Sequence, residues 1–147
     1  SSDVCSSDLG LGLSPDGKWL YHSDTHRNTV HKYEVSPDGS LGPKDALCVL
    51  PGEAPDGLAV SADGRIWVAL ASSGCVVVLD AGGAEVERLS IPVPMCTSVC
   101  FGGDDLQDLY IVSGSNGTGS EKGGGVYRTR ADSAGVPVPL AKVALPT

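Results

Sequence analysis

The feature that most constrains this chain is an internal repeat. Residues 10–24 read GLGLSPDGKWLYHSD and residues 57–71 read GLAVSADGRIWVALA, so the two copies start 47 residues apart. Each copy has a Gly-Leu start, a Ser-x-Asp-Gly turn, a basic residue, a tryptophan and an apolar strand. A weaker third copy, SVCFGGDDLQDLYIVS, covers residues 98–113. Repeats of about 40–50 residues with several short strands each are typical of β-propeller blades.

Glycine and proline turns divide the chain into short strands. An Asp-Gly pair between two apolar runs is a strong hairpin signal, because glycine tolerates the positive φ that such a turn requires. No window has the periodicity of a long helix. We predict an all-β chain, a partial β-propeller of about three four-stranded blades, at residues 10–50, 51–90 and 91–147. Strands are predicted at residues 19–23, 29–35, 46–50, 58–60, 66–70, 75–79, 85–89, 97–101, 109–113 and 125–130, and residues 136–146 are predicted as an edge strand or a tail.

The first nine residues, SSDVCSSDL, do not fit the repeat. They are polar, lack strand or helix periodicity and resemble a peptide translated from sequencing-adapter DNA. We expect residues 1–9 to be non-native, with the true chain beginning further upstream; an ordinary disordered N-terminus is the alternative. No function is assigned to them.

Charge and composition exclude several classes of function. The net charge is −8 with no basic run, which argues against binding to nucleic acid. No apolar stretch approaches the length of a membrane span, and no signal-peptide pattern is present. Five cysteines without a CxxC motif indicate free thiols, two or three of them buried, rather than a disulfide framework or a zinc site. We expect a cytoplasmic protein.

The histidines, Asp24 and the glycine-rich stretch are predicted to have structural rather than functional roles. His22, His26 and His31 lie in a strand-and-loop segment, where their spacing does not bring imidazoles to one metal, so we expect a solvated loop. Asp24 is predicted to cap the turn that follows it. The glycine-rich stretch at residues 114–124 lacks a phosphate-binding motif and a following helix, and is predicted to be a surface loop.

Asp56 is the candidate functional residue. It lies between Pro55 and Gly57 at the start of an apolar strand, outside the alternating pattern of that strand. A Pro-Asp-Gly turn would by itself explain an aspartate here. However, the corresponding positions in the other copies are Leu9 and Thr97, so no common turn rule requires it. Thr97 either lines the same channel or is an ordinary strand residue.

The repeats also carry a family resemblance. The segments are GLGLSPDGKWLYHSDT (10–25), APDGLAVSADGRIWVAL (54–70), GCVVVLDAGGAEVERLSIPV (74–93), TSVCFGGDDLQDLYIV (97–112) and GGVYR (124–128). Together they resemble the C-terminal half of the regucalcin/gluconolactonase (senescence marker protein) family. The resemblance implies a six-bladed propeller that binds one divalent cation in its central channel and hydrolyses sugar or other lactones.

The resemblance assigns Asp56 two roles, metal ligand and catalytic base. It implies Ca²⁺ or Zn²⁺ as the cation, with Mg²⁺ and Mn²⁺ as further options, and a small-molecule lactone as substrate. Leu9 departs from the family pattern, which has a ligating asparagine there. A further glutamate ligand and the substrate-contacting residues of the family lie upstream of this sequence. Because one carboxylate does not hold a divalent cation, we expect this chain to be inactive alone. A non-catalytic binding propeller is the alternative, and Asp56 distinguishes the two.

Overall fold

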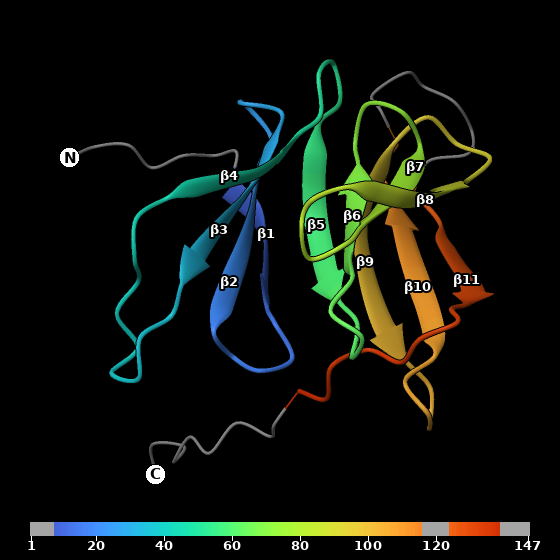
Figure 1. The fold of residues 1–147 in the computed structure, drawn as a ribbon. Helices are drawn as coiled ribbons and strands as arrows, with labels where there is room; N and C mark the ends of the chain where they lie inside the picture. Colours follow the sequence, from blue (N-terminus) through green and yellow to red (C-terminus); the bar gives the residue numbers. More distant parts are fainter. Residues whose placement is uncertain (1–7, 116–123, 139–147) are drawn as a thin grey trace, which may run out of the picture.

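The computed structural model describes residues 8–115 and 124–138. In these residues eleven strands form three antiparallel sheets, and there is no helix (Figure 1). The first sheet has the order β1 (Asp8–Leu13), β2 (Trp19–Asp24), β3 (Thr29–Glu34) and β4 (Asp45–Val49). The second has β5 (Pro55–Val60), β6 (Ile66–Leu70), β7 (Cys75–Leu79) and β8 (Glu85–Ser90). The third has β9 (Cys96–Gly102), β10 (Asp108–Ser113) and β11 (Val126–Arg130).

The arrangement is that of neighbouring propeller blades. Each sheet is an up-and-down meander in which strands adjacent in sequence pair with one another. The first strands of the sheets, β1, β5 and β9, lie next to one another, and β4 and β8 are the outer strands (Figure 1). The all-β prediction and the partial propeller are confirmed. The third sheet has three strands rather than four within the described residues.

The repeated Ser-x-Asp-Gly motif builds the first turn of two sheets. In both copies the serine hydroxyl donates to the aspartate carboxylate at 2.6 Å, and this carboxylate also accepts the N–H of the basic residue two positions later. The glycine of each turn has positive φ, 69° in the first copy and 87° in the second. The motif is therefore structural. Its members are Ser14, Asp16, Gly17 and Lys18 in the first copy and Ser61, Asp63, Gly64 and Arg65 in the second.

The glycine that opens each copy allows the inner strands to approach closely. A Cβ at Gly10 would overlap the carbonyl oxygen of Asp56 and lie 2.9 Å from the nitrogen of Leu58. A Cβ at Gly57 would lie 2.8 Å from the Cα of Ser98. Because real Cβ atoms do not come this close to backbone, only glycine permits this spacing of β1, β5 and β9.

Two apolar clusters fill the spaces between the sheets. One joins the first and second sheets around Tyr21, Val30 and Leu70, and the other joins the second and third sheets around Trp67, Val99 and Leu109. The second sheet lies between the clusters, so every residue of β6 is buried. The run at residues 76–79 is also fully buried, as its continuous apolar sequence predicted.

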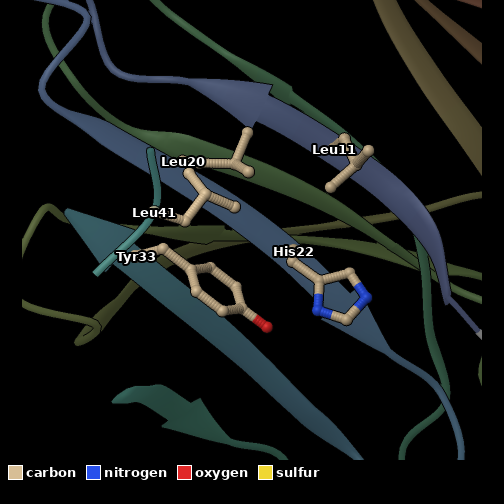
Figure 2. Close-up of a pocket in the computed structure, with 5 residues that line it drawn as sticks. All are labelled: Leu11, Leu20, His22, Tyr33 and Leu41. Atoms are coloured by element: carbon tan, nitrogen blue, oxygen red, sulfur yellow. The ribbon is translucent and has the colours of Figure 1, made fainter. Parts of the chain in front are cut away.

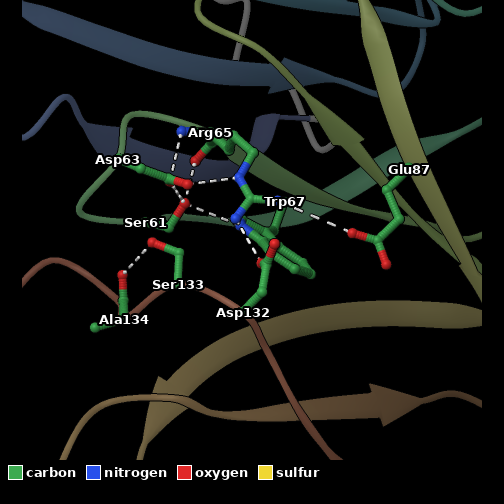
Figure 3. A network of polar contacts seen from close by, with 8 residues as sticks. All are labelled: Ser61, Asp63, Arg65, Trp67, Glu87, Asp132, Ser133 and Ala134. Carbon is green, nitrogen blue, oxygen red and sulfur yellow. Dashed lines mark hydrogen bonds and ion pairs between the residues drawn. The ribbon is translucent and has the colours of Figure 1, made fainter.

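After β11 the chain turns back beneath the second sheet (Figure 1). The N–H of Ala62 donates to the carbonyl of Ala134, and Gly135 forms a bridge with Ser61. Figure 3 shows the accompanying ion pairs: Arg65 binds Asp132 at 2.5 Å as well as the turn carboxylate of Asp63 at 2.7 Å. The described part of the predicted edge strand at residues 136–146 therefore runs along the second sheet. Residues 139–147 lie outside the described residues.

The close approach at Gly57 gives a first prediction. Gly57→Ala is expected to lower the free energy of unfolding by about 1–3 kcal/mol, because the added methyl group must push β5 and β9 apart. Urea denaturation would measure this change. Gly82→Ala is the control, since its Cβ would meet only the Asp80 side chain, at 3.3 Å. Equal effects of the two substitutions would contradict the inferred packing constraint.

Candidate functional site

Each inner strand contains a β-bulge near its start, and the three corresponding residues of the repeat lie in these bulges. In the first sheet Asp8 and Gly10 pair with consecutive residues of β2, which leaves Leu9 as the extra residue. The β9–β10 pairing likewise skips Thr97. In the second sheet the register shifts between Pro55 and Leu58, so Asp56 lies within the bulge. Bulges turn a side chain away from the regular ladder and are frequent near functional sites.

Asp56 is half-buried and not neutralised by a cationic side chain. Among the described residues no Lys, Arg or His lies within ion-pair distance of its carboxylate. Burial raises the pKa of the Asp56 carboxyl above its ordinary value, and the N–H of Gly57 offsets part of this effect. Burial also raises the pKa of the Cys96 thiol, which is near Asp56, to about 11. An unpaired, partly desolvated carboxylate is typical of a binding or catalytic position.

The other two bulge positions cannot act in the same way. Leu9 has no ligating atom, and 56% of its surface is exposed. Thr97 is half-buried and donates its hydroxyl to the carbonyl of Val112 within its own sheet, at 3.1 Å.

The described residues do not by themselves complete a metal site. Within residues 8–115 and 124–138, no group of three or more His, Cys, Asp or Glu side chains could hold a metal ion. Calcium and magnesium require several oxygen ligands, and Asp56 alone supplies one side chain. The structure therefore places one carboxylate at the start of an inner strand and leaves its assignment as metal ligand and catalytic base a prediction.

His22 and His31 are not solvated, and this part of the loop prediction is wrong. They lie directly opposite each other on β2 and β3, both less than 9% exposed, with ring centroids 6.0 Å apart. His26 is exposed in the connecting turn. Residues on both faces of this part of β2 and β3 are buried, and the two imidazoles are among them.

Asp24 caps its turn as predicted, but it is also fully buried. Its carboxylate accepts hydrogen bonds from the N–H and the guanidinium of Arg27, both at 3.0 Å, and from Lys44 at 3.3 Å. Burial alone would raise the pKa of this carboxyl, yet these donors outweigh burial and lower the pKa to about 2. Asp24 is an anchor for the β2–β3 hairpin.

A hydrogen bond between the first two sheets was not predicted from the sequence. The hydroxyl of Thr25, in the same hairpin, donates to the carbonyl of Pro55 at 2.6 Å. This bond joins the first sheet to the start of β5, directly before Asp56. Nothing in local sequence marks a contact between residues 30 positions apart.

Asp56 lines neither of two cavities that lie within the described residues. Figure 2 shows the first, of about 370 Å³, on a face of the first sheet, lined by Leu11, Leu20, His22, Tyr33 and Leu41. The second, of about 440 Å³, lies among the later residues of β1, β5 and β9 and is largely apolar. Neither is lined by a carboxylate, and the first contains one imidazole, that of His22, beside the phenol of Tyr33.

The remaining sequence predictions concern thiols and the glycine-rich loop. Of the four described cysteines, all free, Cys96 is buried, Cys48 and Cys75 are half-buried and Cys100 is exposed. Cys5 and residues 116–123 lie outside the described residues. Across the part of the chain that is described, no helix has the length and apolar character to cross a membrane.

Comparison with known proteins identifies the family. A family model described as SMP-30/Gluconolactonase/LRE-like region matches residues 3–115. The chain belongs to this family. It is 34% identical over 140 residues to a 6-deoxy-6-sulfogluconolactonase of Pseudomonas putida, covering 89% of this chain and 48% of the relative. It is 35% identical over 129 residues to a pentonolactonase of Haloferax volcanii, covering 86% of this chain and 44% of the relative.

Solved structures of SMP-30/gluconolactonase relatives share the fold. A luciferin-regenerating enzyme matches with a TM-score of 0.78 and 28% identity, over 90% of this chain and 49% of that one. A calcium-binding protein, regucalcin, from Agrobacterium tumefaciens matches with a TM-score of 0.66 and 26% identity, over 71% of this chain and 37% of that one. The chain thus spans less than half the length of these relatives.

The Asp24 anchor gives a prediction about pH. Because its folded pKa of about 2 is below the ordinary value of 3.8, ionised Asp24 stabilises the fold above about pH 4, and this stabilisation disappears as the pH falls toward 2. Asp24→Asn is expected to remove about 2 kcal/mol of stability at pH 7 and to flatten the pH dependence between 4 and 2. Urea denaturation at several pH values would measure both.

Asp38→Asn is the control, because Asp38 also caps a turn but is exposed. Its substitution is expected to change the pH dependence much less. A wild-type pH profile in Asp24→Asn would show that Asp24 is not the anchor.

Proposed function

We propose that this chain is part of a metal-dependent hydrolase that opens sugar lactones, with Asp56 at its active site. The observation that carries the proposal is the half-buried Asp56 carboxylate, which lies in a bulge at the start of an inner strand and has no cationic partner among the described residues. The family and its lactonase relatives support the reaction class.

The proposed chemistry is hydrolysis of an ester within a ring. Asp56, as general base, accepts a proton from water, and the oxygen of that water bonds to the lactone carbonyl carbon. The bond between that carbon and the ring oxygen then breaks, and the ring oxygen takes up the proton that Asp56 accepted. The product is an open-chain hydroxy acid.

Metal dependence is the second part of the proposal. A divalent cation supplies positive charge that polarises a lactone carbonyl. The Asp56 carboxylate could supply one oxygen ligand to such an ion, and the remaining ligands would have to come from outside the described residues. The calcium-binding regucalcin from A. tumefaciens supports Ca²⁺, with Zn²⁺, Mg²⁺ and Mn²⁺ as options.

The substrate is proposed only as a class. The names of the relatives refer to different sugar lactones, a 6-deoxy-6-sulfogluconolactone and a pentonolactone. We propose a small-molecule sugar lactone as the partner, a cytoplasmic location, and no binding to nucleic acid or to a membrane.

Leu9 favours the alternative function, a non-catalytic binding propeller. An apolar residue in the bulge of β1 removes one position at which the family places a ligand. If Leu9 is native, Asp56 is the only one of the three bulge residues with a carboxylate, and recognition by loops becomes the better account.

The deciding experiment uses the full-length protein. The complete reading frame should be recovered from the source DNA and assayed for gluconolactone hydrolysis with and without EDTA, beside Asp56→Ala. We expect hydrolysis that EDTA abolishes and a loss in Asp56→Ala of at least about 100-fold, the contribution of a general base. An asparagine in place of Leu9 would further support the proposal. Absence of both metal binding and turnover in the intact protein would favour the binding propeller.

A separate prediction concerns the 147-residue chain alone. Lactone hydrolysis by this chain is expected to be undetectable, because its described residues contain no group of three or more His, Cys, Asp or Glu side chains that could hold a metal ion. A titration assay of acid release with purified chain and added Ca²⁺ would test this. Turnover that depends on the cation would contradict the prediction.

A further inference from the structure

We propose that Thr25 is a positioning residue that holds Asp56 in place for catalysis, an inference that rests on the proposed lactonase function. The Thr25 hydroxyl donates to the Pro55 carbonyl at 2.6 Å. That carbonyl belongs to the peptide group that joins Pro55 to Asp56. The bond therefore fixes the orientation of the peptide plane from which the Asp56 side chain projects.

The start of β5 needs such support because its ladder is interrupted. The register of β5 and β6 shifts between Pro55 and Leu58, and proline has no N–H to give to a ladder. Just before Pro55, the backbone still has a hydrogen bond to the β6 side of the sheet: the N–H of Ala71 donates to the carbonyl of Ala54. Between Ala54 and Leu58, the carbonyl of Pro55 accepts its hydrogen bond from Thr25, which belongs to the neighbouring first sheet.

The hairpin that carries Thr25 is itself rigidly held. Asp24, the preceding residue, is fully buried, and its carboxylate binds Arg27 and Lys44. Within the same hairpin, the hydroxyl of Thr29 donates to the carbonyl of Arg27 at 2.8 Å. The Thr25 hydroxyl is thus presented from a fixed position rather than from a mobile loop.

A second contact with the first sheet lies on the other side of Asp56. Gly10 packs so closely against the carbonyl of Asp56 and the nitrogen of Leu58 that a Cβ there would overlap them. Thr25 and Gly10 therefore hold the backbone on either side of the Asp56 side chain. A shift of this backbone moves the carboxylate, and misplacement by about 1 Å can cost about 100-fold in rate.

The test compares three variants of the intact full-length enzyme. Thr25→Val keeps the shape of the side chain but removes the donor, and Thr25→Ser restores a donor. Thr29→Val is the matched control, because it also deletes a threonine hydroxyl bond in this hairpin but leaves the Pro55 contact in place.

We expect Thr25→Val to lower kcat about 10- to 100-fold with little change in KM, and Thr25→Ser to recover most of the loss. Thr29→Val is expected to lower Tm by a similar amount while kcat stays within about twofold. Without substrate, hydrogen exchange at residues 54–58 should be faster in Thr25→Val than in Thr29→Val.

Each outcome bears on a separate claim. If Asp56→Ala abolishes activity but Thr25→Val and Thr29→Val behave alike in kcat and in hydrogen exchange, Thr25 is a structural residue and this inference is wrong. If the wild-type enzyme has no lactonase activity, the proposed function fails, and the inference fails with it.

Discussion

The close packing of the inner strands is the constraint on which the rest of the structure depends. Gly10 and Gly57 place the backbones of β1, β5 and β9 at distances that no side chain would allow. The sheets can then face one another with two continuous apolar clusters between them. Because neighbouring sheets meet at their inner strands, any residue that leaves the ladder there is brought near its counterparts. The opening glycine of the repeat is thus a packing residue that also defines where a site can form.

The β-bulges at the starts of the inner strands determine where the candidate site lies. Leu9, Asp56 and Thr97 occupy equivalent bulges, yet only Asp56 carries a charge, and burial there raises its pKa. A carboxylate left without a cationic partner costs stability, which is the usual signature of a group retained for binding or catalysis. Elsewhere, the Asp24 and Arg65 networks pair charged groups, join turns and sheets, and contribute to architecture.

Sequence reasoning singled out Asp56 as a candidate because it differs from the other copies of the repeat, and misjudged residues whose surroundings come from neighbouring strands. His22 and His31 follow no helical spacing, and their burial depends on the pairing of β2 with β3. No role was predicted for Thr25 from the sequence, because the acceptor of its hydrogen bond, Pro55, lies 30 residues away in the chain. The described start of the segment predicted as an edge strand or a tail lies against the second sheet, where the N–H of Val136 donates to the carbonyl of Val60.

By itself, the sequence determined the all-β class, the repeat, the turns and nearly every strand, since these follow from local chemistry: glycine at positive φ, serine–aspartate turns and apolar runs. It also singled out one carboxylate. Only the tertiary structure decided that Asp56 lies in a bulge, that it lacks a cationic partner among the described residues and that Thr25 supports its backbone. These properties depend on the register between strands and on contacts between sheets, which no local pattern encodes.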